Sequence, residues 1–126
     1  MKISCKKLFF IGFALLFPLL SAACVSDFDG SRTGNDSQLI MDYRLFNTTD
    51  SQNLTVEAGD VVHVEITAEG GRLSLTIQKD GEPPLYEKDS IATSDAFDLE
   101  APESENYTVT VTGKRAKGGF RCIVEG

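Results

Sequence analysis

From residue 38 onward the chain alternates between apolar and polar residues, and this period of two constrains its fold more than any other feature. The segments 61–67, 72–79 and 107–112 each place apolar side chains on one side and polar side chains on the other. Successive side chains of a β-strand point to opposite faces, so this spacing predicts half-buried strands. No stretch after Cys24 shows helical periodicity over three turns, which indicates an all-β domain.

Turn residues separate the alternating segments. Gly70-Gly71 and Asp80-Gly81 are the clearest examples, and Asp-Gly is a strong hairpin signal. Seven or eight short antiparallel strands at this spacing predict a small β-sandwich or jelly roll. We expect strands over 38–46, 53–57, 61–67, 72–79, 96–99, 107–112 and 120–125, with a shorter extended segment around 85–86.

The first 23 residues have the three parts of an export signal. Three lysines precede the apolar run 8–20, and the small residues 21–23 follow it. The apolar run is too short for a spanning helix, which needs ~20 residues. Removal of residues 1–23 leaves 103 of the 126 residues, which is the size of one domain.

Cys24 directly follows the export signal. Leu-Ser-Ala-Ala-Cys at 20–24 resembles the bacterial lipobox (Leu, small, small, Cys), with the leucine one place further out. The resemblance implies that Cys24 forms a thioether to diacylglycerol and becomes the new N-terminus of a bacterial lipoprotein. The chain would then be lipid-anchored at the extracytoplasmic face of the cell membrane. The alternative is ordinary secretion, with cleavage after Ala23.

The segment between Cys24 and the alternating region is rich in Gly, Ser, Asp and Asn. Such a composition is typical of a flexible linker, and about a dozen residues reach ~20 Å. We therefore expect a lipidated tether over 24–37, followed by the β-sandwich domain over 38–126.

Loss of the three signal lysines lowers the formal net charge from −7 to −10. Such a charge disfavours nucleic acid as a partner and disfavours adhesion to anionic lipid headgroups. The one basic segment is 113–119, where we expect Lys114, Arg115 and Lys117 to lie in a loop. That loop is either a solvated hairpin turn or a binding site for an anionic envelope polymer, such as a teichoic acid, or phosphate.

Few residues of the domain carry catalytic chemistry. His63 is the only histidine and lies on the polar side of its segment, and the chain contains no Gly-x-Ser-x-Gly. Cys122 alternates with Phe120 and Val124, which indicates a buried small apolar residue. No cysteine cluster suits zinc. We expect no catalytic site, no metal and no cofactor.

Three segments resemble a known family. Segment 54–66 contains Ala-Gly-Asp before a strand, 72–81 ends in Asp-Gly, and 99–113 leads a strand with tyrosine. In this order they resemble bacterial pre-peptidase C-terminal domains, although Asn106 stands where that family usually has glycine. The resemblance covers about residues 54–125. It implies a small extracellular β-sandwich that acts as a binding or processing module.

These observations predict a membrane-anchored, non-enzymatic β-sandwich that serves as a binding or accessory module at the cell envelope. Its partner would be a cell-envelope polymer or a protein, besides the membrane itself. Two alternatives stay open: a cryptic hydrolase that uses His63, and a structural subunit of an envelope complex.

Overall fold

The computed structural model describes residues 27–79 and 81–126, so the predicted signal peptide and Cys24 lie outside the described residues. The described chain forms seven antiparallel strands and no helix, which confirms the predicted all-β fold. No helix that could cross a membrane occurs in this part of the chain. The strands are β1 (Phe28–Asn35), β2 (Gln38–Phe46), β3 (Thr49–Val56), β4 (Val61–Lys79), β5 (Tyr86–Ile91), β6 (Asp95–Glu100) and β7 (Glu105–Glu125).

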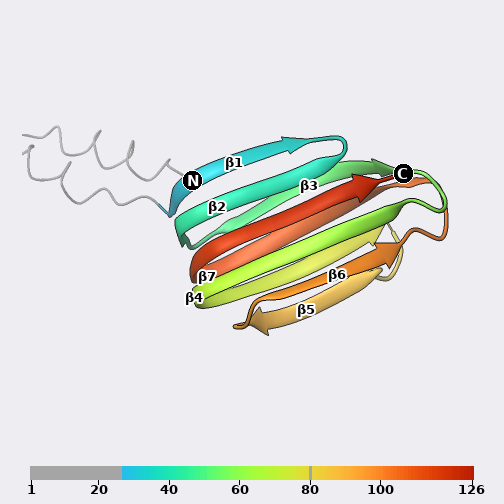
Figure 1. Cartoon of the computed structure of the whole chain (residues 1–126). Helices are drawn as coiled ribbons and strands as arrows, with labels where there is room; N and C mark the ends of the chain where they lie inside the picture. The colour runs from blue at the N-terminus through green and yellow to red at the C-terminus, as the bar shows by residue number, and fades with distance from the viewer. Residues whose placement is uncertain (1–26, 80) are drawn as a thin grey trace, which may run out of the picture.

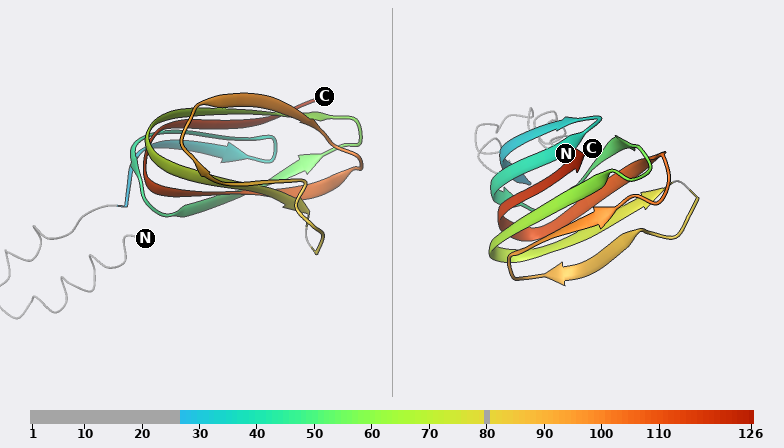
Figure 2. Two further views of the ribbon diagram at one scale, coloured as in Figure 1. Left: turned by 90° about the horizontal axis from the view of Figure 1, so that it is seen from below. Right: turned by 45° about the vertical axis from the view of Figure 1, so that its right-hand side comes forward.

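Two long strands, β4 and β7, organise the fold. They pair antiparallel along nearly their whole length, from Val61 opposite Glu125 to Lys79 opposite Tyr107. Both strands bend in the middle, so that their two halves lie in different layers (Figures 1 and 2). β1, β2 and β6 extend the layer that holds the start of β4, and β3 and β5 extend the other layer. One seven-stranded sheet is thus folded over into a two-layered sandwich.

The structure continues β4 and β7 through the places where the sequence predicted turns. We expected Gly70-Gly71 and the segment 113–119 to reverse the chain, and this expectation was wrong. The two strands stay paired while they bend together, with register shifts on either side of Gly70. Gly71 (φ 71°), Arg115 (φ 52°) and Gly118 (φ 133°) adopt left-handed backbone conformations there. Such residues change the direction of a strand without ending its pairing.

The predicted flexible tether over 24–37 is wrong for residues 28–35, which form the edge strand β1. All eight of its residues have a partner on β2. Only Phe28 and Gly34 are even partly covered, so β1 contributes little to the core and lacks an apolar alternation. Backbone pairing, the contact of the Phe28 ring with Phe46 and the hydrogen bonds of Arg32 hold this strand. Composition gave no signal of it because β1 needs no continuous apolar face.

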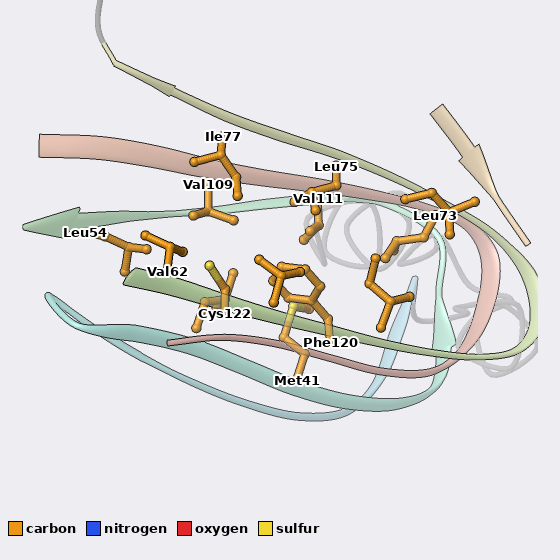
Figure 3. Packing of buried hydrophobic residues seen from close by; sticks show 14 of the residues in the cluster. Met41, Leu54, Val62, Leu73, Leu75, Ile77, Val109, Val111, Phe120 and Cys122 are labelled. Atoms are coloured by element: carbon orange, nitrogen blue, oxygen red, sulfur yellow. The ribbon is translucent and has the colours of Figure 1, made fainter. Parts of the chain in front are cut away.

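The core lies between the two layers and holds most of the predicted inward-facing residues (Figure 3). Phe97, Leu99 and Val124 were also predicted to face inward but are only partly buried against it. Within the described chain no polar or charged side chain is buried. Phe46, Phe120 and Ile77 are completely buried and come from three different strands. The core therefore follows directly from the period of two in the sequence.

The two open sides of the sandwich are closed differently. On one side Arg32 of β1 reaches across to β3, where it donates hydrogen bonds to Asp50 (2.7 Å), the Ser51 carbonyl (3.1 Å) and Gln52 (3.0 Å). On the other side the rings of Tyr86 (β5) and Phe97 (β6) stack with their centroids 4.6 Å apart. The two layers are thus joined on one side by the hydrogen bonds of the Arg32 guanidinium and on the other side by an aromatic contact.

The bend can be tested with two glycines that share a backbone conformation. A Cβ at Gly71 (φ 71°) would lie 2.1 Å from the Arg115 carbonyl oxygen, whereas a Cβ at Gly81 (φ 74°) would meet nothing within 4 Å. We expect Gly81→Ala to lower the free energy of unfolding by about 1–2 kcal/mol, from backbone strain alone. Gly71→Ala should cost about 1–3 kcal/mol more because of the steric clash. Denaturant unfolding measures both, and equal losses would contradict the bend.

Candidate functional site

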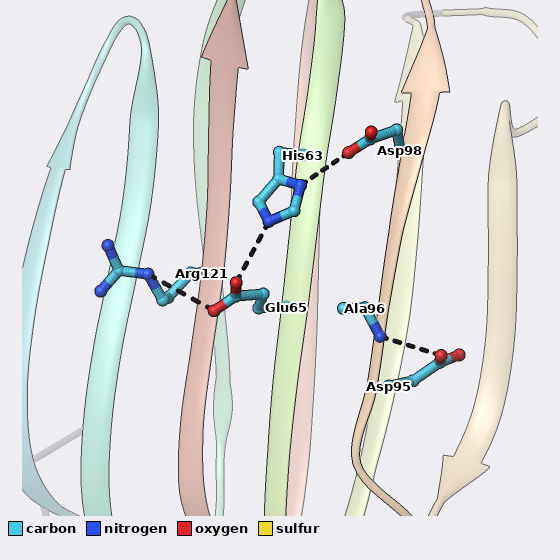
Figure 4. A network of polar contacts seen from close by, with 6 residues as sticks. All are labelled: His63, Glu65, Asp95, Ala96, Asp98 and Arg121. Atoms are coloured by element: carbon cyan, nitrogen blue, oxygen red, sulfur yellow. Dashed lines mark hydrogen bonds and ion pairs between the residues drawn. The ribbon is translucent and has the colours of Figure 1, made fainter.

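A polar network lies on the outer face of the layer that contains β1, β2 and β6, which we call the first layer. It brings together His63, Asp98, Glu65 and Arg121 (Figure 4). His63 Nδ1 lies 2.6 Å from an Asp98 oxygen, and His63 Nε2 lies 3.2 Å from a Glu65 oxygen. Arg121 Nε lies 3.8 Å from the other oxygen of Glu65. β4, β6 and β7 position these groups, because His63 is opposite Asp98 in the register and Glu65 is opposite Arg121.

The two carboxylates favour the protonated imidazole. The hydrogen bond to Asp98, followed by that to Glu65, raises the pKa of His63 above its ordinary value of 6.5. A raised folded-state pKa means that the pairing stabilises the fold fully below the unfolded pKa. The stabilisation is lost as the pH rises through the folded pKa.

The His63–Asp98 pair resembles part of a hydrolytic triad, but the residues next to His63 along and across its strand supply no nucleophile. The cross-strand neighbour of His63 on β7 is Ile123, and Val61 and Glu65 flank His63 on its own strand face. None of these three side chains carries a hydroxyl or a thiol. The pair therefore fits a cross-strand ion pair better than a nucleophile–base arrangement.

The titration of His63 tests this network. Asp98→Asn should lower the pKa of His63 towards its ordinary value, while Asp89→Asn on β5 should leave it unchanged. The destabilisation by Asp98→Asn should be larger below about pH 6 than above about pH 8. NMR titration of the single histidine and thermal unfolding at both pH values provide the measurements. An unchanged His63 pKa in Asp98→Asn would refute the pairing.

Cys122 is fully buried, as the alternation predicted. Burial raises the pKa of its thiol to about 12, so the reactive thiolate is essentially absent at neutral pH. Its side chain lies in the core beside Phe120 and Val62 (Figure 3). Cys122 is therefore a packing residue.

Thiol labelling checks the burial of Cys122. In the folded chain we expect maleimide to leave Cys122 unmodified at neutral pH, and in denaturant we expect complete modification. Mass spectrometry of the peptide that contains Cys122 gives the measurement. Rapid labelling of the native protein would show that the thiol is accessible.

The three residues of the predicted basic loop lie on the bend of β7. Lys114, Arg115 and Lys117 are all exposed, so their exposure agrees with the prediction although the segment is paired strand rather than a loop. The fold adds a fourth cation, because Lys114 is opposite Arg72 on β4. Arg72 could not be predicted from the sequence, since only the strand register places it beside Lys114. We call Arg72, Lys114, Arg115 and Lys117 the basic bend.

The layer that contains β3 and β5, which we call the second layer, carries uncharged polar side chains on its outer face. They lie on three adjacent strands. This surface was not predicted, although the repeat Thr108, Thr110 and Thr112 is a signal of it in the sequence. Adjacent side chains on such a face lie ~6.7 Å apart along a strand and ~4.8 Å apart across strands. We define this hydroxyl face as Thr49, Ser51, Asn53 and Thr55 of β3, Asn106, Thr108, Thr110 and Thr112 of β7, and Ser74, Thr76 and Gln78 of β4.

Hydrogen bonds between strands order the hydroxyl face. The Thr49 and Thr112 hydroxyls lie 3.0 Å apart, and the Thr108 hydroxyl donates to Asn53 over 3.0 Å. None of the eleven side chains is charged, on a chain whose formal net charge is −7. The face therefore offers a regular set of neutral donors and acceptors.

The donor chemistry of the described residues offers no metal centre. No group of three or more His, Cys, Asp or Glu side chains within residues 27–79 and 81–126 lies close enough to hold an ion.

The sequence matches no known family model and no curated protein, but the fold resembles solved β-sandwiches. PliG, a periplasmic inhibitor of g-type lysozyme from Aeromonas hydrophila, shares 13% identity over 78% of this chain and 88% of its own, with a TM-score of 0.44. The carbohydrate-binding module CBM6cm-2 of Cellvibrio mixtus lichenase 5A shares 11% identity over 80% of this chain and 88% of its own (TM-score 0.43). At these identities the likeness concerns the fold alone.

Proposed function

We propose that this chain is a lipid-anchored, non-catalytic binding module on the extracytoplasmic side of a bacterial membrane. Its hydroxyl face binds an uncharged carbohydrate polymer of the cell envelope. The observation that carries the proposal is the hydroxyl face itself, with eleven neutral hydrogen-bonding side chains on three adjacent strands of an acidic protein.

A neutral glycan suits this surface for chemical reasons. Sugar hydroxyls both donate and accept hydrogen bonds, as do the threonine and serine hydroxyls and the asparagine amides of the face. A charged polymer would instead require Arg or Lys for bidentate or ionic contacts. A polymer ligand also matches an extended flat face, because repeated weak contacts add along its length.

The anchor rests on the sequence at the N-terminus. Lys2, Lys6 and Lys7, the apolar run, the small residues 21–23 and Cys24 together fit a lipoprotein signal. Cys122 is buried in the domain and follows no such signal, so Cys24 is the cysteine that this pattern marks for modification. Two or three acyl chains hold a protein stably in a membrane, whereas one chain is marginal.

Metabolic palmitate labelling tests the anchor. The wild-type chain should carry label and sediment with membranes, and Cys24→Ala should lose the label and release protein into the medium. Cys122→Ala is the matched control and should stay labelled and membrane-bound. Retention of label in Cys24→Ala would refute lipidation at this residue.

Affinity electrophoresis in gels that contain neutral polysaccharides tests the binding face. Thr110→Glu places a charge at the centre of the hydroxyl face and should weaken retardation by at least about tenfold in Kd, because it buries an unpaired charge against a neutral ligand. Thr67→Glu makes the same change on β4 in the other layer and should bind like wild type. Equal binding by both variants, or no retardation in any neutral polysaccharide, would contradict the proposed ligand class.

A further inference from the structure

The charges of the sandwich are divided unevenly between its two ends. At the end opposite the bends, Lys79 is accompanied by eight acids: Asp36, Glu57, Asp60, Glu82, Glu100, Glu103, Glu105 and Glu125. The bend end carries the five cations Arg44, Arg72, Lys114, Arg115 and Lys117. They offset the acids of that end, which include Asp27, Asp29, Glu69 and Asp95. The acidity of the domain is therefore concentrated away from the bends.

The cations of the bend end cluster on the basic bend. Arg72 and Lys114 are cross-strand neighbours, and Arg115 and Lys117 follow on β7. Arg44, in contrast, is paired with Asp29 at 2.8 Å, so its charge is already balanced. The basic bend thus supplies the positive charge that this end can offer to a partner.

The basic bend is well separated from the acidic end. The nine residues of β2 span the layer, which at ~3.3 Å per residue places the two ends ~30 Å apart. This distance is several Debye lengths at physiological ionic strength, so the acids of the far end are screened from the basic bend.

The chain enters the sandwich beside the basic bend. The Asn47 backbone N–H donates to the Asp27 carbonyl over 2.8 Å, and the Asn47 side-chain oxygen accepts from the Arg115 backbone N–H over 3.0 Å. Figures 1 and 2 show the start of β1 at the same end as the bends of β4 and β7. Three residue steps separate Asp27 from Cys24, and they span at most ~11 Å when fully extended.

We infer that the basic bend docks on anionic phospholipid headgroups of the membrane that holds the anchor. This inference rests on the proposed lipidation of Cys24. The short connection holds the bend within about one Debye length of the headgroups, where lysine and arginine are attracted to an anionic surface. The acidic end points away from the membrane, so the domain stands upright and the hydroxyl face runs along the membrane normal.

Lysine footprinting tests the orientation. The lipidated protein is reconstituted into vesicles of phosphatidylcholine alone or with added phosphatidylglycerol, and acetylation of each lysine is read by mass spectrometry. Phosphatidylglycerol should reduce labelling of Lys114 and Lys117 by about threefold or more, and high salt should restore it. Lys79 lies at the acidic end and is the internal control, with the same labelling rate in both kinds of vesicle.

A charge-reversal pair sharpens the test. Lys114→Glu should abolish the protection of Lys117 by phosphatidylglycerol. The matched control is Lys88→Glu, which reverses an exposed lysine on β5 outside the basic bend and should leave at least about half of that protection in place. Equal loss of protection in both variants would show that net charge, rather than the basic bend, controls docking.

The remaining outcomes separate this inference from the proposed anchor. Equal labelling of Lys114 and Lys117 in both kinds of vesicle, in protein that floats with the vesicles, would overturn the inference alone. Protein that does not float would overturn the proposed anchor and this inference together. Protection by soluble teichoic acid in phosphatidylcholine vesicles, without protection by phosphatidylglycerol, would overturn the inference in favour of a polymer ligand.

Discussion

The antiparallel pairing of β4 with β7 joins the two layers and positions the other strands. The two strands stay hydrogen-bonded from Val61–Glu125 to Lys79–Tyr107 while they pass from one layer to the other. Every other strand except β1 pairs with one of them. The bend must therefore be accommodated in both strands at once. Gly71 allows it because glycine has no side chain, whereas a Cβ at this position would clash with the Arg115 carbonyl.

Local sequence predicted the faces of the sandwich but not its connectivity. Alternation correctly placed Val64, Ile77 and Cys122 in the core, because burial of one face requires it. The continuity of β4 through Gly70-Gly71 was not visible, since a pair of glycines serves a turn and a shared bend equally well. Strand β1 was missed because it pairs through its backbone and buries little of its own surface.

The candidate sites were harder to predict than the core, because register brings their members together. His63 was visible as a lone histidine, but Asp98 lies 35 residues further along the chain. Arg72 joins the basic bend only because it is opposite Lys114. The charge balance of the whole chain also concealed the charge difference between its two ends. An acidic protein therefore has a surface suited to anionic lipid, which composition alone had disfavoured.

We have proposed that the domain rests on the membrane through its basic bend. Neutron reflectometry of the lipidated protein on a supported bilayer with anionic phospholipid measures this placement. With the basic bend on the headgroups, we expect protein density that begins at the headgroups and extends outward by ~30 Å, the length of the strands. A water-filled layer of ~20 Å between headgroups and protein, the reach of a flexible tether, would contradict it.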